Sequence, residues 1–433
     1  MTTNTTKKIN GIMLGLLLFT VPSVWGQTAV QLTLEQAVER ALRQNPTISE
    51  AEHELEEADA RLKQARAHYV PHITTSGIAK IGLSGALNAL SPIGLANSPF
   101  YRNFAEGLNI YHPGFDFGRT THLVGHEKYR RDVFEANLET AKAAVRLETT
   151  RAYYRALQAK RLKEVAYIVV RSREANVRLA EAFYQGKLRS RLDLEMARFS
   201  LSQAKLQALQ AENSHQETIA MLGLAMGASQ ETQYDLIEPD KPLPEAGSLA
   251  DWVQQSLTHR PELIALRADI EAATEALLFA ESQRKPMLSF AFSGGYARFT
   301  DVLARQLLAL GAGLYFPLYT GGDLEGRIEE ARARLKTLES QLQVLEQKFE
   351  LETRTAYLRL QNALQSIETL NERASYAREA TGLARARYQE RLGSIVELTQ
   401  AESNLAEAEA SKVIGVYSAR TTEAELQFAV GRR

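Results

Sequence analysis

Within Leu314-Tyr-Phe-Pro-Leu-Tyr-Thr-Gly-Gly-Asp-Leu-Glu-Gly-Arg327 the hydrophobic pattern changes its period, and this change indicates how the chain folds. Up to Leu318 apolar and mainly small residues alternate, which predicts a strand with one apolar face. From Leu324 to Phe349 the apolar residues follow a strict four-three spacing, the pattern of a coiled-coil seam. A strand therefore passes through a short glycine hinge directly into a very long helix, and the same junction occurs earlier, at Ile110–Arg119.

The repeated junction belongs to an internal duplication that covers most of the chain. Matching residues before the return strands are separated by 215 residues, and those after them by 204: Pro46 and Pro261, Pro71 and Pro286, then Pro113 and Pro317, Gly118 and Gly322, Tyr184 and Tyr388. The difference of 11 residues must fall between Pro71 and Pro113. Residues 84–102 there are rich in Gly, Pro, Asn and Ser, which predicts an inserted loop.

Each repeat is expected to contain an opening helix, two strands, a long helix and a shorter helix that runs back. In the first repeat, 27–237, the helix covers Leu34–Tyr69, the strands about 71–83 and 103–113, and the long helices about 118–185 and 190–228. In the second repeat, 249–433, the corresponding ranges are Leu249–Gln283, about 286–299 and 306–319, and about 322–389 and 394–430, after a linker at 238–248. The predicted fold class is mainly α with a small β part.

Composition excludes several classes of function. The chain has 433 residues, a net charge of −1 and no cysteine. The charge gives no reason to expect nucleic acid as a partner, and the lack of cysteine excludes disulfides, thiolate metal sites and a lipid anchor on cysteine.

Residues 1–26 resemble a secretory signal peptide, because Lys7 and Lys8 precede an apolar run, Gly11–Val21. An uncleaved anchor is the alternative, although the run is short for a bilayer span of about 20 residues.

No later segment is apolar for long enough to form a membrane helix, so a membrane location would require strands. Four strands cannot close a barrel, and open edges are not tolerated in lipid, so several chains would have to share one barrel. A small soluble sheet is the alternative.

Along the predicted long helix at about 322–389, the apolar seam changes from Leu-rich to small residues, which predicts a helical assembly that narrows toward Tyr388. The small residues are Ala374, Ala377, Thr381 and Ala384.

Over residues 28–430 the chain resembles the TolC family of outer-membrane efflux proteins. The stretches that carry the resemblance are Leu32-Thr-Leu-Glu-Gln-Ala-Val38 with Asn45-Pro46, Tyr315-Phe-Pro-Leu-Tyr-Thr-Gly-Gly-Asp323, and Ile395-Val-Glu-Leu-Thr-Gln-Ala401. The resemblance implies a homotrimer with a twelve-stranded outer-membrane β-barrel, continued by a periplasmic α-helical barrel.

The function that the resemblance implies is a passive exit duct of a tripartite efflux or type I secretion system. An inner-membrane transporter would deliver substrate through a periplasmic adaptor protein, and outer-membrane lipid would surround the strands. No enzymatic activity and no cofactor are expected. A periplasmic coiled-coil scaffold protein is the alternative function.

The same resemblance supplies the site residues. Acidic residues that match Asp193 and Glu397 lie near the inner end of the family's tunnel, and Glu397 matches a ring that lines its aperture. Gln400 stands where a second acidic ring would be, which predicts a less negative constriction. Tyr388 matches a tyrosine of the family that holds neighbouring helix pairs together in the closed state. The family has an arginine five residues after this tyrosine, and Gly393 stands at that position here. The alternative is that both acids only begin helices, where the helix dipole favours them.

Basic residues cluster at the two predicted helix tips: Lys187, Arg189, Arg191 and Arg391. The resemblance favours adaptor docking, and a solvated turn is the alternative.

His122 and His126, with His112 nearby, have a spacing that can hold a metal, but no further ligand is organised around them, and exposed histidines are expected instead. No Ser-His-Asp order or nucleophile elbow is present, so no catalytic or metal-binding residue is expected.

Overall fold

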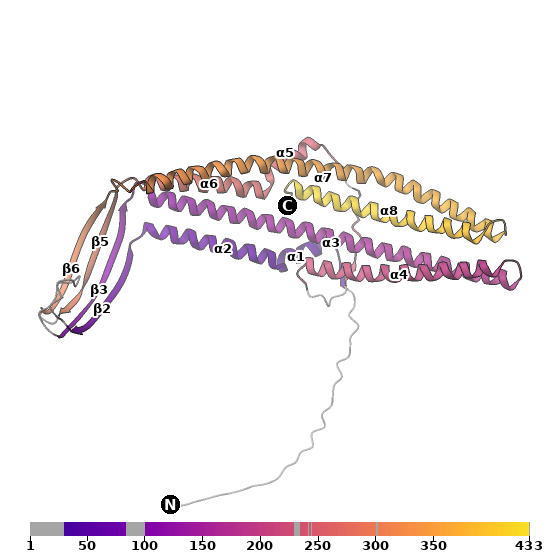
Figure 1. Cartoon of the computed structure of the whole chain (residues 1–433), viewed down its shortest axis with the longest axis horizontal. Coiled ribbons are helices and arrows are strands. Elements are labelled where there is room, and N and C mark those ends of the chain that lie inside the picture. Colours follow the sequence, from indigo (N-terminus) through magenta and orange to yellow (C-terminus); the bar gives the residue numbers. More distant parts are fainter. Residues whose placement is uncertain are drawn as a thin grey trace, which may run out of the picture.

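The computed structural model of the chain describes residues 30–83, 100–228, 234–240, 242–243, 245–299 and 302–432. The molecule is elongated, with a four-stranded sheet at one end and two helical hairpins that end at the other (Figure 1). The predicted signal peptide lies outside the described residues, as do residues 84–99 of the predicted loop. That loop ends earlier than expected, because a strand already begins at Phe100.

Two strands from each repeat form one antiparallel sheet in the order β2-β3-β5-β6. The strands are β2 (His72–Leu83), β3 (Phe100–Phe115), β5 (Met287–Phe299) and β6 (Val302–Tyr315). The last strand ends at Tyr315 instead of about 319, because Pro317 has no N–H to continue the ladder. Strands β2 and β6 are the edges, and no described strand pairs with their outer sides.

The register places the apolar residues of all four strands on one face. Ile73 lies opposite Ile110, Ile110 opposite Phe292, and Phe292 opposite Leu310. This face covers no core of the protein: the side chains of Leu310 and Leu314 are 83% and 72% exposed. The period-two pattern of the sequence therefore corresponds to an apolar surface that is open to the surroundings.

The opposite face of the sheet carries small and polar side chains. Thr74, Asn109, Ser293 and Ala309 lie side by side across the four strands. Ser293 Oγ donates to Asn109 Oδ1 at 2.9 Å, and Asn109 Nδ2 donates to Ser76 Oγ at 3.2 Å. A hydrogen-bonded polar row therefore crosses the boundary between the two repeats.

The opening helices correct the prediction, because each is divided in two. The first repeat has α1 (Leu34–Gln44) and α2 (Pro46–Arg66), and the second has α5 (Leu249–His259) and α6 (Pro261–Ser282). Asn45 and Arg260 are extended, each with ψ 124°. A residue before proline is forced out of the helical region, whereas proline itself suits the first position of a helix. The single helices expected over Leu34–Tyr69 and Leu249–Gln283 are therefore wrong.

Two hairpins of long helices form the rest of the molecule. They are α3 (Arg119–Gln185) with α4 (Arg191–Ala225), and α7 (Asp323–Gln389) with α8 (Ile395–Ala429). Helices α3 and α7 have 67 residues each, about 100 Å at 1.5 Å per residue. Toward the sheet α3 packs between α2 and α6, and toward the tips it packs between α4 and α8. No helix in the described ranges is long and apolar enough to cross a membrane.

The glycine junctions begin both long helices. Gly118 and Gly322 precede α3 and α7 with φ values of 91° and 90°, a region that favours glycine.

His122 and His126, just beyond the first junction, contact α6 and are not exposed as the sequence predicted. His122 Nδ1 lies 2.7 Å from Glu275 Oε2, and His126 Nδ1 lies 2.9 Å from the carbonyl oxygen of Ala272.

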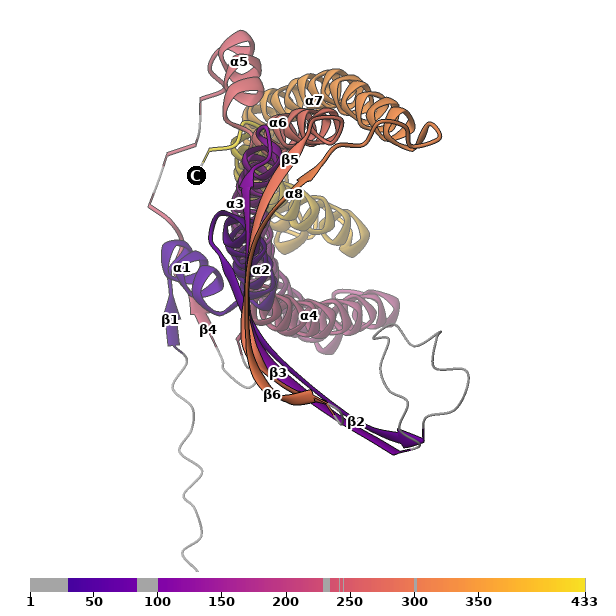
Figure 2. The same ribbon diagram turned by 90° about the vertical axis from the view of Figure 1, so that its left-hand side faces the viewer.

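A small parallel pair of strands, which the sequence did not predict, joins the start of the first repeat to its end. Strand β1 (Val30–Leu32) pairs with β4 (Tyr234–Leu236). Figure 2 shows α1, β1 and β4 to one side of the layer formed by α2, α3 and α6. The hydroxyl of Tyr153 in α3 lies 2.9 Å from the carbonyl oxygen of Leu32 and 2.5 Å from that of Ile237. This buried tyrosine therefore fixes both strands to the middle of α3.

Candidate functional site

The two helix tips have the same local construction. Lys187 and Arg391, which occupy equivalent positions of the two repeats, have φ values of 58° and 66°. Beyond each turn a serine begins the return helix: the backbone N–H of Asp193 donates to Ser190 Oγ at 3.3 Å, and the backbone N–H of Glu397 donates to Ser394 Oγ at 3.1 Å. Asp193 and Glu397 therefore lie in the first turn of α4 and α8, where a negative charge suits the helix dipole.

The tips of the two hairpins touch through Arg189. Its Nη2 donates to the carbonyl oxygen of Gly393 at 2.6 Å, and its guanidinium lies 5.5 Å from the centre of the Tyr388 ring. Phe183 contacts the same ring edge to face at 5.8 Å. Arg189 is half-buried, whereas Lys187 and Arg391 are exposed. Of the basic residues predicted to dock an adaptor, Arg189 is thus the one that joins the two hairpins of the protomer.

Tyr388 is fully buried between the hairpins, in a cluster that includes Ala180, Leu194 and Leu398. Its hydroxyl has no hydrogen-bond partner among the described residues. Burial raises the pKa of the phenol, the charge of Asp193 raises it further, and that of Arg189 opposes both. Within one protomer Tyr388 therefore holds the hairpins together by ring packing.

The aperture acids predicted from the sequence differ in their surroundings. Glu397 Oε1 pairs with Arg387 Nε at 3.1 Å, and the two side chains are 45% and 56% exposed. Gln400 is exposed and donates to Asn404 Oδ1 at 2.9 Å. Asp193 accepts only from the hydroxyl of Ser190, at 3.2 Å, among the side-chain bonds of the described residues. Arg387, a partner that partly balances Glu397, was not among the predicted site residues.

A second contact between the hairpins, also unpredicted, lies further from the tips. Arg173 of α3 and Glu402 of α8 are 4% and 5% exposed, and Arg173 Nη1 lies 2.8 Å from Glu402 Oε2. Burial lowers the pKa of Arg173, and the charge of Glu402 opposes that shift. One signal was available: Arg173 matches Ala377, a small seam residue, across the 204-residue offset. A charge at a seam position indicates a buried partner.

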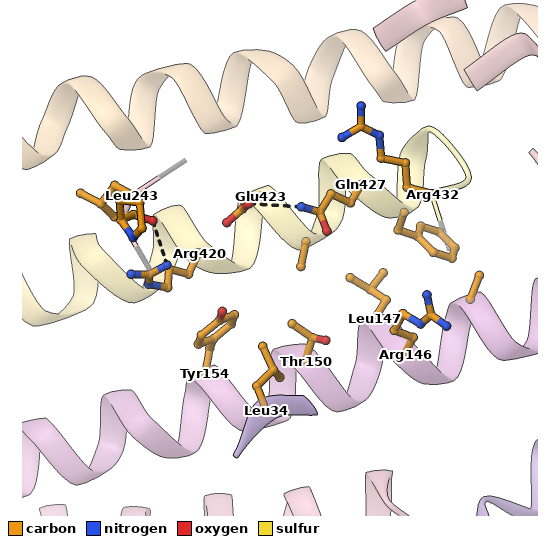
Figure 3. Close-up of a pocket in the computed structure, with 14 residues that line it drawn as sticks. Leu34, Arg146, Leu147, Thr150, Tyr154, Leu243, Arg420, Glu423, Gln427 and Arg432 are labelled. Atoms are coloured by element: carbon orange, nitrogen blue, oxygen red, sulfur yellow. Dashed lines mark hydrogen bonds between the residues drawn. The ribbon is translucent and has the colours of Figure 1, made fainter. Parts of the chain in front are cut away.

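Grooves adjoin this pair. One, of about 820 Å³, is lined by α3, α7 and α8, with Ile168, Leu405 and Ala406 among its apolar residues and Arg378 and Arg385 among its charged ones. Another, of about 320 Å³, is lined by α3, α4 and α8. A third pocket, of about 390 Å³, lies where α3, α8 and the linker meet, and it contains none of the predicted site residues (Figure 3). There Arg420 Nη1 donates to the carbonyl oxygen of Pro242 at 3.3 Å.

Comparisons with known proteins agree with this architecture. A family model described as outer membrane efflux protein matches residues 37–228 and 252–432. Protein CyaE of Bordetella pertussis is 24% identical over 412 residues, which are 92% of this chain and 84% of the relative.

Solved structures share the fold at low sequence identity. The outer membrane protein VceC of Vibrio cholerae has a TM-score of 0.80 at 22% identity, covering 92% of this chain and 96% of that one. CusC has a TM-score of 0.80 at 18% identity, with 94% and 95% covered. The open state of the MtrE outer membrane channel of Neisseria gonorrhoeae has a TM-score of 0.76 at 16% identity, with 92% and 88% covered.

Proposed function

This chain belongs to the outer membrane efflux protein family, and we infer that three copies of it assemble into one exit duct. The protein is a channel of the outer membrane, and its helical part lies in the periplasm. In the proposed assembly the sheets of three copies form one barrel of twelve strands, and the helices continue it as a tunnel. An inner-membrane transporter and a periplasmic adaptor deliver the substrate.

The four-stranded sheet gives the main support for this assembly. Its apolar face, with Leu310 83% exposed, suits lipid, and its other face, with Asn109 and Ser293, suits a water-filled interior. Its edges β2 and β6 both lack a neighbour among the described strands. Because unpaired strand edges are not tolerated in lipid, β6 of one copy must pair with β2 of the next.

The outer helices support the same assembly. In the order α4-α3-α8-α7 near the tips, α4 and α7 are the outermost helices of a protomer. Both present large apolar side chains that are more than half exposed: Phe199, Leu206, Leu209 and Leu224 on α4, and Leu358, Tyr376 and Leu383 on α7. Exposed apolar surface on this scale indicates a contact with another protein. In the trimer, α7 of one copy packs against α4 of the next.

The tips form the aperture in this proposal. Glu397 supplies a ring of three carboxylates around the axis, and Gln400 leaves the neighbouring ring neutral. Tyr388 closes the space between the hairpins, and Asp193 lies on the outer hairpin. The exposed tip residues Lys187, Arg191 and Arg391 are the proposed contacts of the adaptor, together with the groove that α3, α7 and α8 line.

Two matched substitutions test the assembly. Leu310→Lys places a charge on the proposed lipid face, at a cost of about 2–4 kcal/mol if it lies near the bilayer midplane. Ala309→Lys, on the opposite face, points the same charge into water. We expect the first variant to reduce the heat-modifiable trimer recovered from the membrane fraction, and the second to leave it unchanged. A wholly soluble monomer for the unsubstituted protein would instead support the periplasmic scaffold.

A further inference from the structure

Glu402 lies at the centre of a buried polar cluster that joins three long helices. Its Oε2 accepts from Asn176 Nδ2 at 2.7 Å and pairs with Arg173 Nη1 at 2.8 Å. Its Oε1 accepts from Ser172 Oγ at 2.9 Å and from Arg385 Nη2 at 2.8 Å. Ser172, Arg173 and Asn176 belong to α3, Arg385 to α7, and Glu402 itself to α8. Each carboxylate oxygen therefore has two partners: those of Oε2 both come from α3, and those of Oε1 come from α3 and α7.

Arg173 also contacts α8 at several points, although its Nη1 meets Glu402 as an ion pair only and makes no hydrogen bond among the described residues. Besides the ion pair, its Nη2 donates to the carbonyl oxygen of Thr399 at 3.1 Å and to Ser403 Oγ at 3.0 Å. Both acceptors are on α8. A guanidinium that binds one helix at three points fixes how far α3 and α8 can slide or rotate against each other.

The contacts between the hairpins at the tips are of a different kind. There, in the part of the chain that the structure describes, the polar contact is the bond from Arg189 to a single carbonyl oxygen, that of Gly393, on a turn. The rest is ring packing around Tyr388, with a hydroxyl that is already unpaired among the described residues. Separating the tips uncovers few groups that need partners, whereas separating the helices at Glu402 would leave buried charges unpaired.

We propose that the Arg173–Glu402 pair is the pivot of the aperture, so that the α7–α8 hairpin opens by moving below this pair while the pair itself stays closed. The proposal rests on the proposed function, because it assigns these residues a positioning role in the gate. Arg385 is the member of the cluster that a bound partner can reach, since its side chain is 46% exposed and lines the groove between α3 and α7.

The test is Glu402→Gln, measured as single-channel opening in planar bilayers. The amide keeps the shape of the carboxylate but removes its charge, so the hairpins can also separate at the level of residue 402, and open conformations that the intact pair excludes become accessible. We expect the ratio of closed to open states to fall about tenfold, which corresponds to about 1.4 kcal/mol. Glu407→Gln is the matched control on the same helix, because Glu407 is 68% exposed and pairs with Arg373 on the surface, at 2.7 Å. The control should leave the ratio unchanged.

A cross-link at the tips separates a pivot from a merely structural role. Because the chain has no cysteine, Lys187→Cys and Arg391→Cys introduce the only thiols, and a reducible bismaleimide can join them. In the Glu402→Gln background the cross-link should restore the closed state, and reduction should release it again. Openings that persist with the tips joined would mean that the substitution damages the wall elsewhere, and would overturn the proposal.

Two further outcomes distinguish a failure of the pivot from a failure of the proposed function. If Glu402→Gln lowers only the heat resistance of the trimer, with unchanged opening, the cluster is structural and the pivot is wrong. If the unsubstituted protein forms no channel in bilayers, the proposed function itself fails.

Discussion

Arg189 Nη2 lies 2.6 Å from the carbonyl oxygen of Gly393, and the two residues occupy equivalent positions of the two repeats. At Gly393 the chain lacks an arginine that the family resemblance leads one to expect. Here the guanidinium comes from the other repeat and reaches the backbone of that same position. A side chain at 393 would be crowded, since a Cβ there would lie 3.1 Å from Glu397 Oε2 and 3.2 Å from Arg387 Cβ.

Arg189→Ala is therefore expected to weaken the contact between the two hairpin tips. The substitution removes a charge-assisted hydrogen bond and the cover over the Tyr388 ring, worth about 1–2 kcal/mol per protomer. Conductance of the resting channel in planar bilayers should rise. Arg189→Lys should behave like Arg189→Ala in part, because lysine lacks the planar fork. Arg191→Ala is the control, since that side chain is 78% exposed and its ion-pair partner among the described residues, Glu195, is on the same helix.

Tyr388 should depend on its ring and not on its hydroxyl. Tyr388→Phe removes a buried hydroxyl that has no partner among the described residues, so conductance should not change and heat resistance should be equal or higher. Tyr388→Ala should destabilise the tips by about 3–5 kcal/mol, the usual loss for a buried aromatic ring, and should raise conductance. A rise for Tyr388→Phe would mean that the hydroxyl bonds a neighbouring copy.

The sequence predicts the long elements well because they depend on local periodicity. The seam from Leu324 to Phe349 defines one face of a helix whatever surrounds it, and the alternation up to Leu314 defines a strand. The interruptions of the opening helices at Asn45 and Arg260 also have a local cause, the proline that follows each residue. The helical pattern continues on both sides of each proline, so the sequence alone does not reveal the interruption. Strands β1 and β4, three residues each, are too short to show any period.

The candidate site was less accessible to sequence reasoning. Asp193 and Glu397 could be placed because they follow turns that the duplication aligns. The partners of these residues could not, because Arg189 reaches Gly393 and Arg173 reaches Glu402 across more than 200 residues of sequence. Such contacts depend on how two hairpins pack against each other, which no local pattern records.

Alkaline pH should destabilise the middle of the molecule through its buried tyrosines. Tyr417 is 3% exposed and donates to Glu238 Oε1 at 2.9 Å; burial, followed by this bond, raises its pKa to about 12. An unfolded tyrosine has a pKa of about 10. Because the folded value is the higher one, the stabilisation is complete below about pH 10 and is lost as the pH rises toward 12.

The measurement is the thermal unfolding midpoint between about pH 8 and pH 12. Tyr417→Phe should start from a lower midpoint, because the bond to Glu238 is gone, and should lose less of it at high pH. Tyr167→Phe is a suitable control, since Tyr167 is 46% exposed. Parallel curves for Tyr417→Phe and the unsubstituted protein would argue against the shift.

Ion preference should depend mainly on Glu397. In the proposed trimer, three copies of this carboxylate lie around one axis and attract cations, and Gln400 adds no charge beside them. Glu397→Ala should therefore weaken cation preference and block by divalent cations in planar bilayers, and Gln400→Asp should strengthen both. Arg387→Ala should act like Gln400→Asp, because it removes the cation that lies 3.1 Å from Glu397. Asp193→Ala, on the other hairpin, should do less. If Glu397→Ala leaves selectivity and block unchanged, the carboxylate serves only the first turn of α8, beside the Ser394 hydroxyl, and the narrowest part of the tunnel lies elsewhere.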